Sequence, residues 1–222
     1  MQKFDTPAGR STVVDIPAGR IRFIAADRDN TAVEILPADA SKSRDVKAAE
    51  ETTVTYIDGV LRIEAAPAKN RVIGSSGSIE LTIQLPAGSR VEAKAASAEF
   101  RCVGRLGDVS FEGAQAKVEI EEAASARLTL MSGDVSVGRL GGDAQISTQK
   151  GDLRIAEAVR GTVTLRTEHG EITVGAARGV SASLDAGTSY GRIHNSLQNS
   201  EGVAGLNIHA STNYGNITAR SL

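Results

Sequence analysis

The chain has 222 residues and a formal net charge of −2, so it lacks the basic footprint of a nucleic-acid-binding protein and the polybasic patch of a membrane-surface protein. Hydrophobic residues make up 41% of it but aromatic residues only 3%, and Trp is absent. The core must therefore consist mainly of Val, Ile, Leu and Ala, which is typical of thin, regularly layered structures.

Residues 1–90 have the pattern of irregular β structure. Two segments, STVVDIPAG at 11–19 and IELTIQLPAG at 79–88, each read as a strand followed by a Pro-Ala-Gly turn. Asp58-Gly59 is a hairpin signal between two alternating segments. Residues 40–51 predict a short charged helix, which Ser41 or Ser43 could cap. We expect this region to form an N-terminal β cap that covers the first unit of the repeats described next.

A repeat dominates the rest of the chain. The segments GDVSV, GDLRI, GEITV, GRIHN and GNITA begin at glycines that are 18, 19, 21 and 24 residues apart. Apolar and polar residues alternate after each glycine, as expected of strands with one buried face. A weaker copy begins at Gly107. The glycines of the clear copies are Gly133, Gly151, Gly170, Gly191 and Gly215, and the apolar position two residues further on holds Val109, Val135, Leu153, Ile172, Ile193 and Ile217.

A second strand precedes each glycine and supplies another apolar column, so each repeat reads as strand, glycine turn, strand, glycine turn. Glycine suits such corners because it adopts positive φ without penalty. Two short strands cannot bury their apolar faces alone, and stacking the repeats does so. We predict an all-β fold: a β-solenoid of about six two-strand rungs over residues 91–222. A β-sandwich or meander is the alternative. The second column is Leu130, Ile146, Leu165, Leu184 and Ile208.

Two further features of the repeats carry structural expectations. A Thr column before the corners predicts hydroxyl hydrogen bonds between rungs. The last two repeats each gain two residues before this Thr, at 186–187 and 210–211, which we expect to bulge outward. The column comprises Thr148, Thr167, Thr188 and Thr212.

The segment QLPAGSRVEAKAAS, followed by the GDVSV, GDLRI and GEITV repeats, resembles the bacterial "putative adhesin" β-strand-repeat family, a domain-of-unknown-function family. The similarity extends over nearly the whole chain and is most specific over residues 80–175. It implies a β-solenoid-like fold and an adhesive or cell-surface role. It implies no catalytic residues.

Acidic residues follow several corner glycines, and three of them, Asp134, Asp152 and Glu171, should stand about one rung apart. Stacked carboxylates could bind Ca²⁺, or act as the carboxylate pair of a retaining glycosidase. They could equally be turn residues whose oxygens accept hydrogen bonds from nearby backbone amides. The remaining members of this column are Asp108, Arg192 and Asn216.

Tyr190 and Tyr214 share the position before a corner glycine and should stack. The pair could bind a partner or a glycan, or simply stabilise the last rungs. His169, His194 and His209 are scattered and indicate no metal site, and Cys102 is expected to be a small buried hydrophobe. No polar segment follows the last repeat, so we expect self-association through the C-terminal edge.

The sequence therefore predicts a non-enzymatic interaction or scaffold protein that needs no cofactor and binds a protein partner or a second copy of itself. A cation-binding structural repeat and a glycan-acting enzyme are the alternatives. The opening residues MQKFDTPAGR contain no apolar signal-like stretch, so we expect a cytoplasmic location, with export as the alternative.

Overall fold

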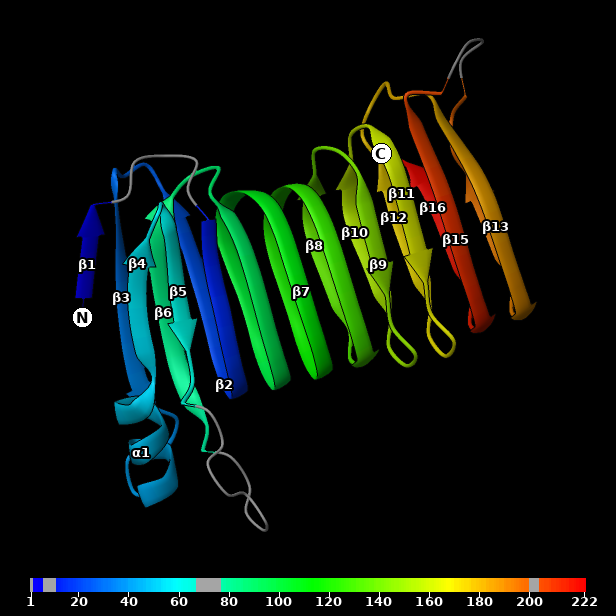
Figure 1. Ribbon diagram of the computed structural model, residues 1–222. Helices are drawn as coiled ribbons and strands as arrows, with labels where there is room; N and C mark the ends of the chain where they lie inside the picture. The colour runs from blue at the N-terminus through cyan, green and yellow to red at the C-terminus, as the bar shows by residue number, and fades with distance from the viewer. Residues whose placement is uncertain (1, 6–10, 67–76, 200–203) are drawn as a thin grey trace.

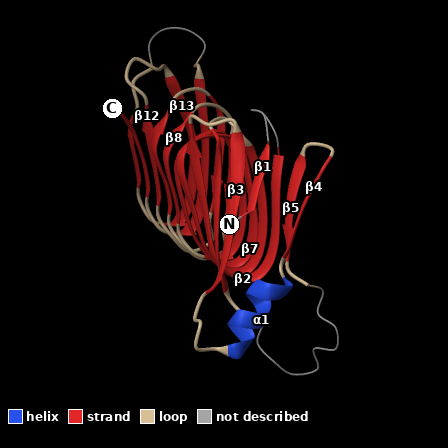
Figure 2. Cartoon of the chain, turned by 90° about the vertical axis from the view of Figure 1, so that its left-hand side faces the viewer, coloured by secondary structure: helices blue, strands red, loops and turns tan. Residues whose placement is uncertain are grey.

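The computed structural model describes residues 2–5, 11–66, 77–199 and 204–222. Nearly all of this chain is β structure, arranged as a row of stacked rungs (Figure 1). Each rung consists of a strand, a corner and a second strand that runs back, so two sheets face each other across one apolar interior (Figure 2). We call these two strands the first arm and the second arm. This architecture is the predicted β-solenoid.

Successive rungs pair in parallel, arm upon arm. One segment, β7 (Arg90–Ser132), is a 43-residue extended stretch that passes round several corners and contributes to both arms. In stacking order, the first arms are β5 (Val60–Glu64), the start of β2 (Ser11–Ala26), parts of β7, β9 (Ala144–Ser147), β11 (Gly161–Arg166), β15 (Leu206–Tyr214) and β13 (Ala182–Tyr190). The second arms are β6 (Ile79–Pro86), the end of β2, parts of β7, β8 (Val135–Leu140), β10 (Leu153–Ala158), β12 (Ile172–Ala176), β16 (Ile217–Ser221) and β14 (Ile193–Ser196).

Antiparallel strands close the N-terminal end of the stack. β4 (Thr53–Ile57) pairs with β5 through a hairpin in which Asp58 and Gly59 have φ of 51° and 81°, as the Asp-Gly signal predicts. β3 (Asn30–Pro37) pairs with β6, and β1 (Gln2–Asp5) pairs with β3. The irregular N-terminal β region is thus present.

The predicted helix is α1 (Ser43–Glu51), which lies below the N-terminal strands in Figure 1. Its N-cap residue is Lys42, without a side-chain cap, so the expected serine cap is wrong. The Ser41 hydroxyl instead donates to Asp39 Oδ1 at 2.6 Å, because the turn before the helix competes for it. No helix in the described ranges is long and apolar enough to cross a membrane.

The stack begins earlier than residue 91. Residues 11–24 pair in parallel with residues 90–103, and the Pro17-Ala18-Gly19 turn forms the corner between the two arms of this rung. β5 and β6 then stack on its two arms, although they are separate in sequence. Of the elements described in residues 1–90, β1, β3, β4 and α1 lie beyond these rungs. The predicted cap of residues 1–90 therefore contains two layers of the solenoid itself.

The first apolar column forms as predicted. Val135, Leu153 and Ile172 are direct partners in neighbouring rungs and are at most 2% exposed. The partner of Val135 on its other side is Val118, not Val109, because Gly107 forms a corner at the opposite end of the rung. The second column forms in part: Ile146 pairs with Leu165, and Leu184 with Ile208, as predicted, but Ile146 faces Leu128 instead of Leu130. Leu165 pairs with Ala210, because the two extra residues lengthen the paired strand instead of bulging outward.

The last two repeats stack in reversed order. β12 pairs with β16 and β11 pairs with β15, so the final repeat in sequence follows residues 161–176 in space. The repeat before it, β13 and β14, lies outside the final one and ends the stack. The C-terminal repeat is therefore covered by its own chain. The predicted exposed edge at the C-terminal repeat is wrong, and the free edge belongs to residues 182–196.

Corner glycines recur for two reasons. At Gly151 φ is +143°, a conformation that residues with a Cβ rarely adopt, as predicted. At Gly170 φ is not in this range, but a Cβ there would collide with the Gly151 carbonyl oxygen of the neighbouring rung. Three of the four predicted Thr hydroxyls donate hydrogen bonds between rungs, to carbonyl oxygens of corner glycines, whereas Thr148 donates to Lys150 of its own rung. Thr167 donates to Gly151, Thr212 to Gly170 and Thr188 to Gly215, at 3.0–3.1 Å.

Three phenylalanines join the interior near β2. Phe100 lies 5.7 Å from Phe23 and 4.7 Å from Phe111 between ring centroids, and all three are at most 1% exposed. Phe100 belongs to a second arm and Phe111 to a first arm, so this cluster ties the two sheets together. Cys102 is buried as predicted, and burial raises the pKa of its thiol, which keeps it protonated.

Candidate functional site

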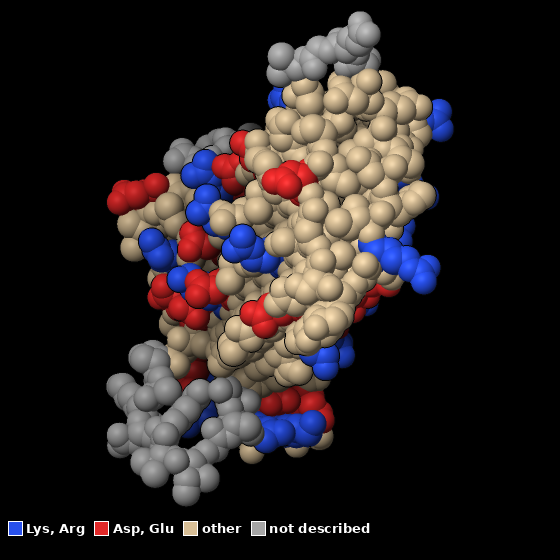
Figure 3. Space-filling view, turned by 90° about the vertical axis from the view of Figure 1, so that its right-hand side faces the viewer, with Lys and Arg blue, Asp and Glu red and all other residues tan. Residues whose placement is uncertain are grey.

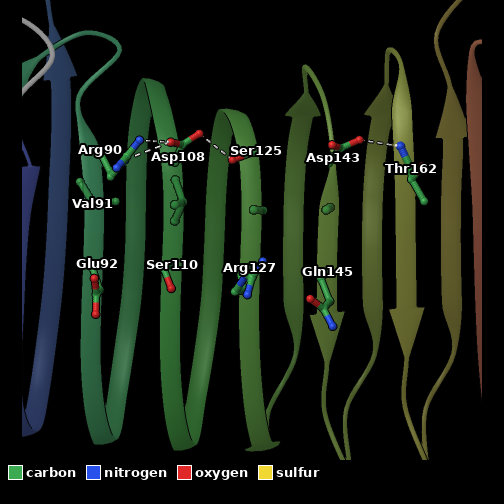
Figure 4. A pocket seen from close by; sticks show the side chains of 13 residues that line it. Arg90, Val91, Glu92, Asp108, Ser110, Ser125, Arg127, Asp143, Gln145 and Thr162 are labelled. Atoms are coloured by element: carbon green, nitrogen blue, oxygen red, sulfur yellow. Dashed lines mark hydrogen bonds and ion pairs between the residues drawn. The ribbon is translucent and has the colours of Figure 1, made fainter.

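A shallow groove of about 590 Å³ runs across the outer face of the first arms (Figure 4). It crosses the parts of β7 that begin at residues 90, 108 and 125, and it reaches β9 and Thr162. Two rows of outward side chains line it because every second residue of a strand points to the outer face. The upper row is Arg90, Asp108, Ser125, Asp143 and Thr162, and the lower row is Glu92, Ser110, Arg127 and Gln145.

The upper row is held by hydrogen bonds between rungs. The Arg90 guanidinium lies 2.8 Å from Asp108 Oδ2, and the Ser125 hydroxyl donates to Asp108 Oδ1 at 2.7 Å. The Ser125 hydrogen bond, followed by the Arg90 interaction, lowers the pKa of Asp108 and favours its charged form. Asp143 Oδ1 accepts the Thr162 backbone N–H at 2.8 Å. These contacts fix the upper rim of the groove.

The lower row is available for binding. Among the described residues, no hydrogen bond or ion pair engages the side chains of Glu92, Arg127 or Gln145, and all three are exposed. Arg127 and Gln145 thus stand on neighbouring rungs, about 4.8 Å apart, and Glu92 stands two rungs from Arg127, with Ser110 between them. Such a row presents donors and acceptors to a ligand that lies across the rungs.

The acidic column lies elsewhere, at the corners between the arms. Asp134 Oδ1 accepts the backbone N–H of Asp152 at 2.9 Å, and Asp152 Oδ1 accepts that of Glu171 at 2.8 Å. Asn216 donates to Glu171 and accepts the N–H of Arg192. The structure thus brings the three predicted acids together in one column and engages each in a hydrogen bond between rungs. Asp108 is not part of this column, because its corner is at the other end of the rung.

The role of this column can be tested at Asp152. Asp152→Ala should lower the free energy of unfolding by about 1 kcal/mol, since the Glu171 amide loses its acceptor, whereas Asp152→Asn keeps an acceptor oxygen and should change it by less than about 0.5 kcal/mol. Urea denaturation with and without millimolar Ca²⁺ measures both effects. A calcium-dependent stabilisation of the wild type that Asp152→Asn abolishes would show instead that the column binds the ion.

The predicted tyrosine pair stacks, and a histidine extends it. The Tyr190 and Tyr214 rings lie 4.9 Å apart with an interplanar angle of 4°, and His169 stacks on the other face of Tyr214 at 4.8 Å and 5°. Sequence reasoning missed His169, although it directly precedes Gly170 and so shares the repeat position of the two tyrosines. Tyr190 is 68% exposed, and among the described residues its ring stacks on Tyr214 alone. His209 lies beside Asp185, at 3.4 Å, and His194 is on the outer face of β14.

The groove itself was not predicted, although the sequence holds a signal for it. Opposite charges recur 18 residues apart, and each pair forms an ion pair between neighbouring rungs. This spacing marks the register of the rungs from residue 90 onward, where the glycine pattern is weak. The pairs are Arg90–Asp108, Lys94–Glu112, Arg101–Glu119 and Arg139–Glu157.

Comparison with a solved structure agrees with the fold. A solved structure described as a putative adhesin from Bacteroides fragilis matches with a TM-score of 0.52 and 13% identity, covering 98% of this chain and 95% of its own. A putative adhesin from Parabacteroides distasonis gives 0.46 and 14%, covering 100% and 95%, and a putative cell adhesion protein from Clostridium sporogenes gives 0.40 and 11%, covering 100% and 98%. At these identities the likeness concerns the fold alone.

No curated protein matches the chain. A family model, Toastrack DUF4097, matches residues 10–221 and thus almost its entire length. This match agrees with the resemblance to the bacterial putative-adhesin family that the repeats indicated. The chain belongs to the Toastrack DUF4097 family.

Proposed function

We propose that this protein is a non-enzymatic binding scaffold that holds an extended segment of a partner protein in the groove of the first arms. The observation that carries the proposal is the lower row, in which Glu92, Arg127 and Gln145 stand exposed across the sheet with no hydrogen bond or ion pair to other described residues. The adhesin descriptions of the structural neighbours support a binding role in general terms.

The chemistry of the groove favours a polypeptide over a glycan. Sugar rings are commonly held on aromatic faces, and none of the residues that line the groove is aromatic. A polypeptide carries charges of both signs together with amide donors and acceptors, which complement an acid, a base and an amide in one row. Because a preformed sheet loses little conformational freedom on binding, such a surface is well suited to recognition.

Charge reversal tests this site. The double variant Glu92→Arg/Arg127→Glu should weaken binding of the partner recovered from native cells by about tenfold or more, since it places like charges opposite each other. The matched control, Arg154→Glu, reverses one charge on the outer face of the second arms and should retain binding. Equal binding by wild type and both variants, measured by surface plasmon resonance, would rule out the groove.

A glycan array and a panel of glycoside substrates test the other two classes of function. We expect that no glycan binds in the groove, so Glu92→Arg/Arg127→Glu should leave any glycan binding unchanged. We also expect that no substrate is turned over. Glycan binding that is lost in Glu92→Arg/Arg127→Glu would reassign the ligand of the groove. Turnover that is lost in Asp134→Asn or Asp152→Asn would overturn the non-enzymatic proposal.

A further inference from the structure

The two ends of the solenoid differ. At the C-terminal end, β13 pairs only with β15 and β14 pairs only with β16 among the described strands. Both arms therefore stop at the same rung, and each presents a free edge of backbone donors and acceptors. Figure 1 shows β13 as the last strand of the row. Such an edge is a template for pairing with another strand.

The interior of this last rung is uncovered. Ile193 is 46% exposed, whereas its partners along the same column, Ile217 and Ile172, are at most 1% exposed. Leu184 and Leu197 are only partly buried against the core. The apolar interior that runs through the whole stack thus opens to the surface between the two free edges.

The described residues of this end carry few charges that would oppose edge pairing. Residues 182–196 include one acidic residue, Asp185, and one basic residue, Arg192, and neither Lys nor Pro. In the view from this end, uncharged surface predominates in the centre and upper part, and charged side chains gather toward the left (Figure 3). A second rung can therefore approach without strong repulsion.

The shape of the two ends decides which occupant fits. The N-terminal end is stepped, because the first arms end with β5 and β4 beyond β2, whereas the second arms continue through β6, β3 and β1. A level end cannot pair along both arms with a stepped one. A level end can pair along both arms with another level end whose arms are the same distance apart. The same end of a second copy meets this condition.

We propose that two copies of this chain associate end to end through β13 and β14. The twofold axis of this dimer lies in the interface, passes through the corner of the last rung and runs between its two arms. Rotation about this axis places β13 of each copy beside β14 of the other. The two strands run in opposite directions because the chain reverses at the corner, so the new pairs are antiparallel. The exposed apolar residues of both copies then meet in one continuous interior. The groove residue nearest to this end is Thr162 on β11, which is separated from β13 by β15. No residue of the groove belongs to β13 or β14, so this association is independent of the function proposed for the groove.

Sedimentation equilibrium of the full chain tests the association. The wild type is expected to show twice the chain mass of 23.1 kDa at micromolar concentration. Ile193→Lys places a charge on the inner face of the last rung. In the monomer this end is open and water solvates the charge, whereas in the dimer the charge is buried. This should raise the dissociation constant of the dimer by about a hundredfold or more. His194→Lys adds the same charge to the outer face of the same strand and should remain dimeric.

Further variants keep the result interpretable. Asn195→Lys also lies on the inner face but removes no apolar contact, so it should dissociate the dimer even if Ile193→Lys proves unstable. Arg192→Cys lies beside the proposed axis and should form a disulfide-linked dimer on oxidation, whereas Ser136→Cys in the middle of the stack should not. A monomeric wild type, dimers that persist in both inner-face variants, or cross-linking through Ser136→Cys alone would overturn the proposal.

Discussion

Gly151→Ala is expected to lower the free energy of unfolding by about 3 kcal/mol or more. Gly151 has φ of +143°, a region that residues with a side chain enter only under strain. A Cβ at this position would also collide with the carbonyl oxygen of Gly133 in the neighbouring rung. Neither problem can be relieved locally, because the two corners are held together by the rungs on both sides. Urea denaturation followed by circular dichroism measures the effect.

Gly187→Ala is the matched control. Gly187 lies within β13 at ordinary φ, and a Cβ built there meets no atom within 4 Å. This substitution should change the free energy of unfolding by less than about 0.5 kcal/mol, or increase it slightly because alanine restricts the unfolded chain. Equal stabilities for the two variants would mean that the corners can accommodate a side chain, contrary to the packing described here.

Phe100→Ala is expected to cost about 3–5 kcal/mol. Phe100 is fully buried and contacts one ring on either side, Phe23 and Phe111, in a chain that has few aromatic residues. Its removal leaves a cavity between the two arms, and the rungs cannot collapse to fill it because their spacing is set by backbone hydrogen bonds. Thermal and urea denaturation of the variant give the magnitude.

Met131→Ala provides the comparison for Phe100→Ala. Met131 is 57% exposed at the end of β7, so its truncation should remain within about 0.5 kcal/mol of the wild type. A loss in Phe100→Ala below about 1 kcal/mol would show that the two sheets do not depend on the ring cluster.

The candidate sites differ in how far they could be predicted. The acidic column and the tyrosine pair follow from glycine spacing, because residues at one distance from a corner occupy one position in successive rungs. The groove depends on the register of β7, where corners occur without the clear glycine pattern. Its register is visible only in opposite charges 18 residues apart, such as Arg90 and Asp108. His169 also follows from this spacing, because it directly precedes Gly170, but only the structure shows that it stacks on Tyr214 and not on Tyr190.

The sequence alone determined that the chain forms short two-strand rungs with glycine corners, because alternation and spacing are local properties of each repeat. It could not determine which rung lies beside which. Ile193 and Ile217 hold the same position in their repeats, so either could be the partner of Ile172, and the structure pairs Ile172 with Ile217 and Ile217 with Ile193. Tertiary structure therefore decided the order of the last two rungs, and with it which backbone edge and which apolar side chains are left open at the end of the molecule.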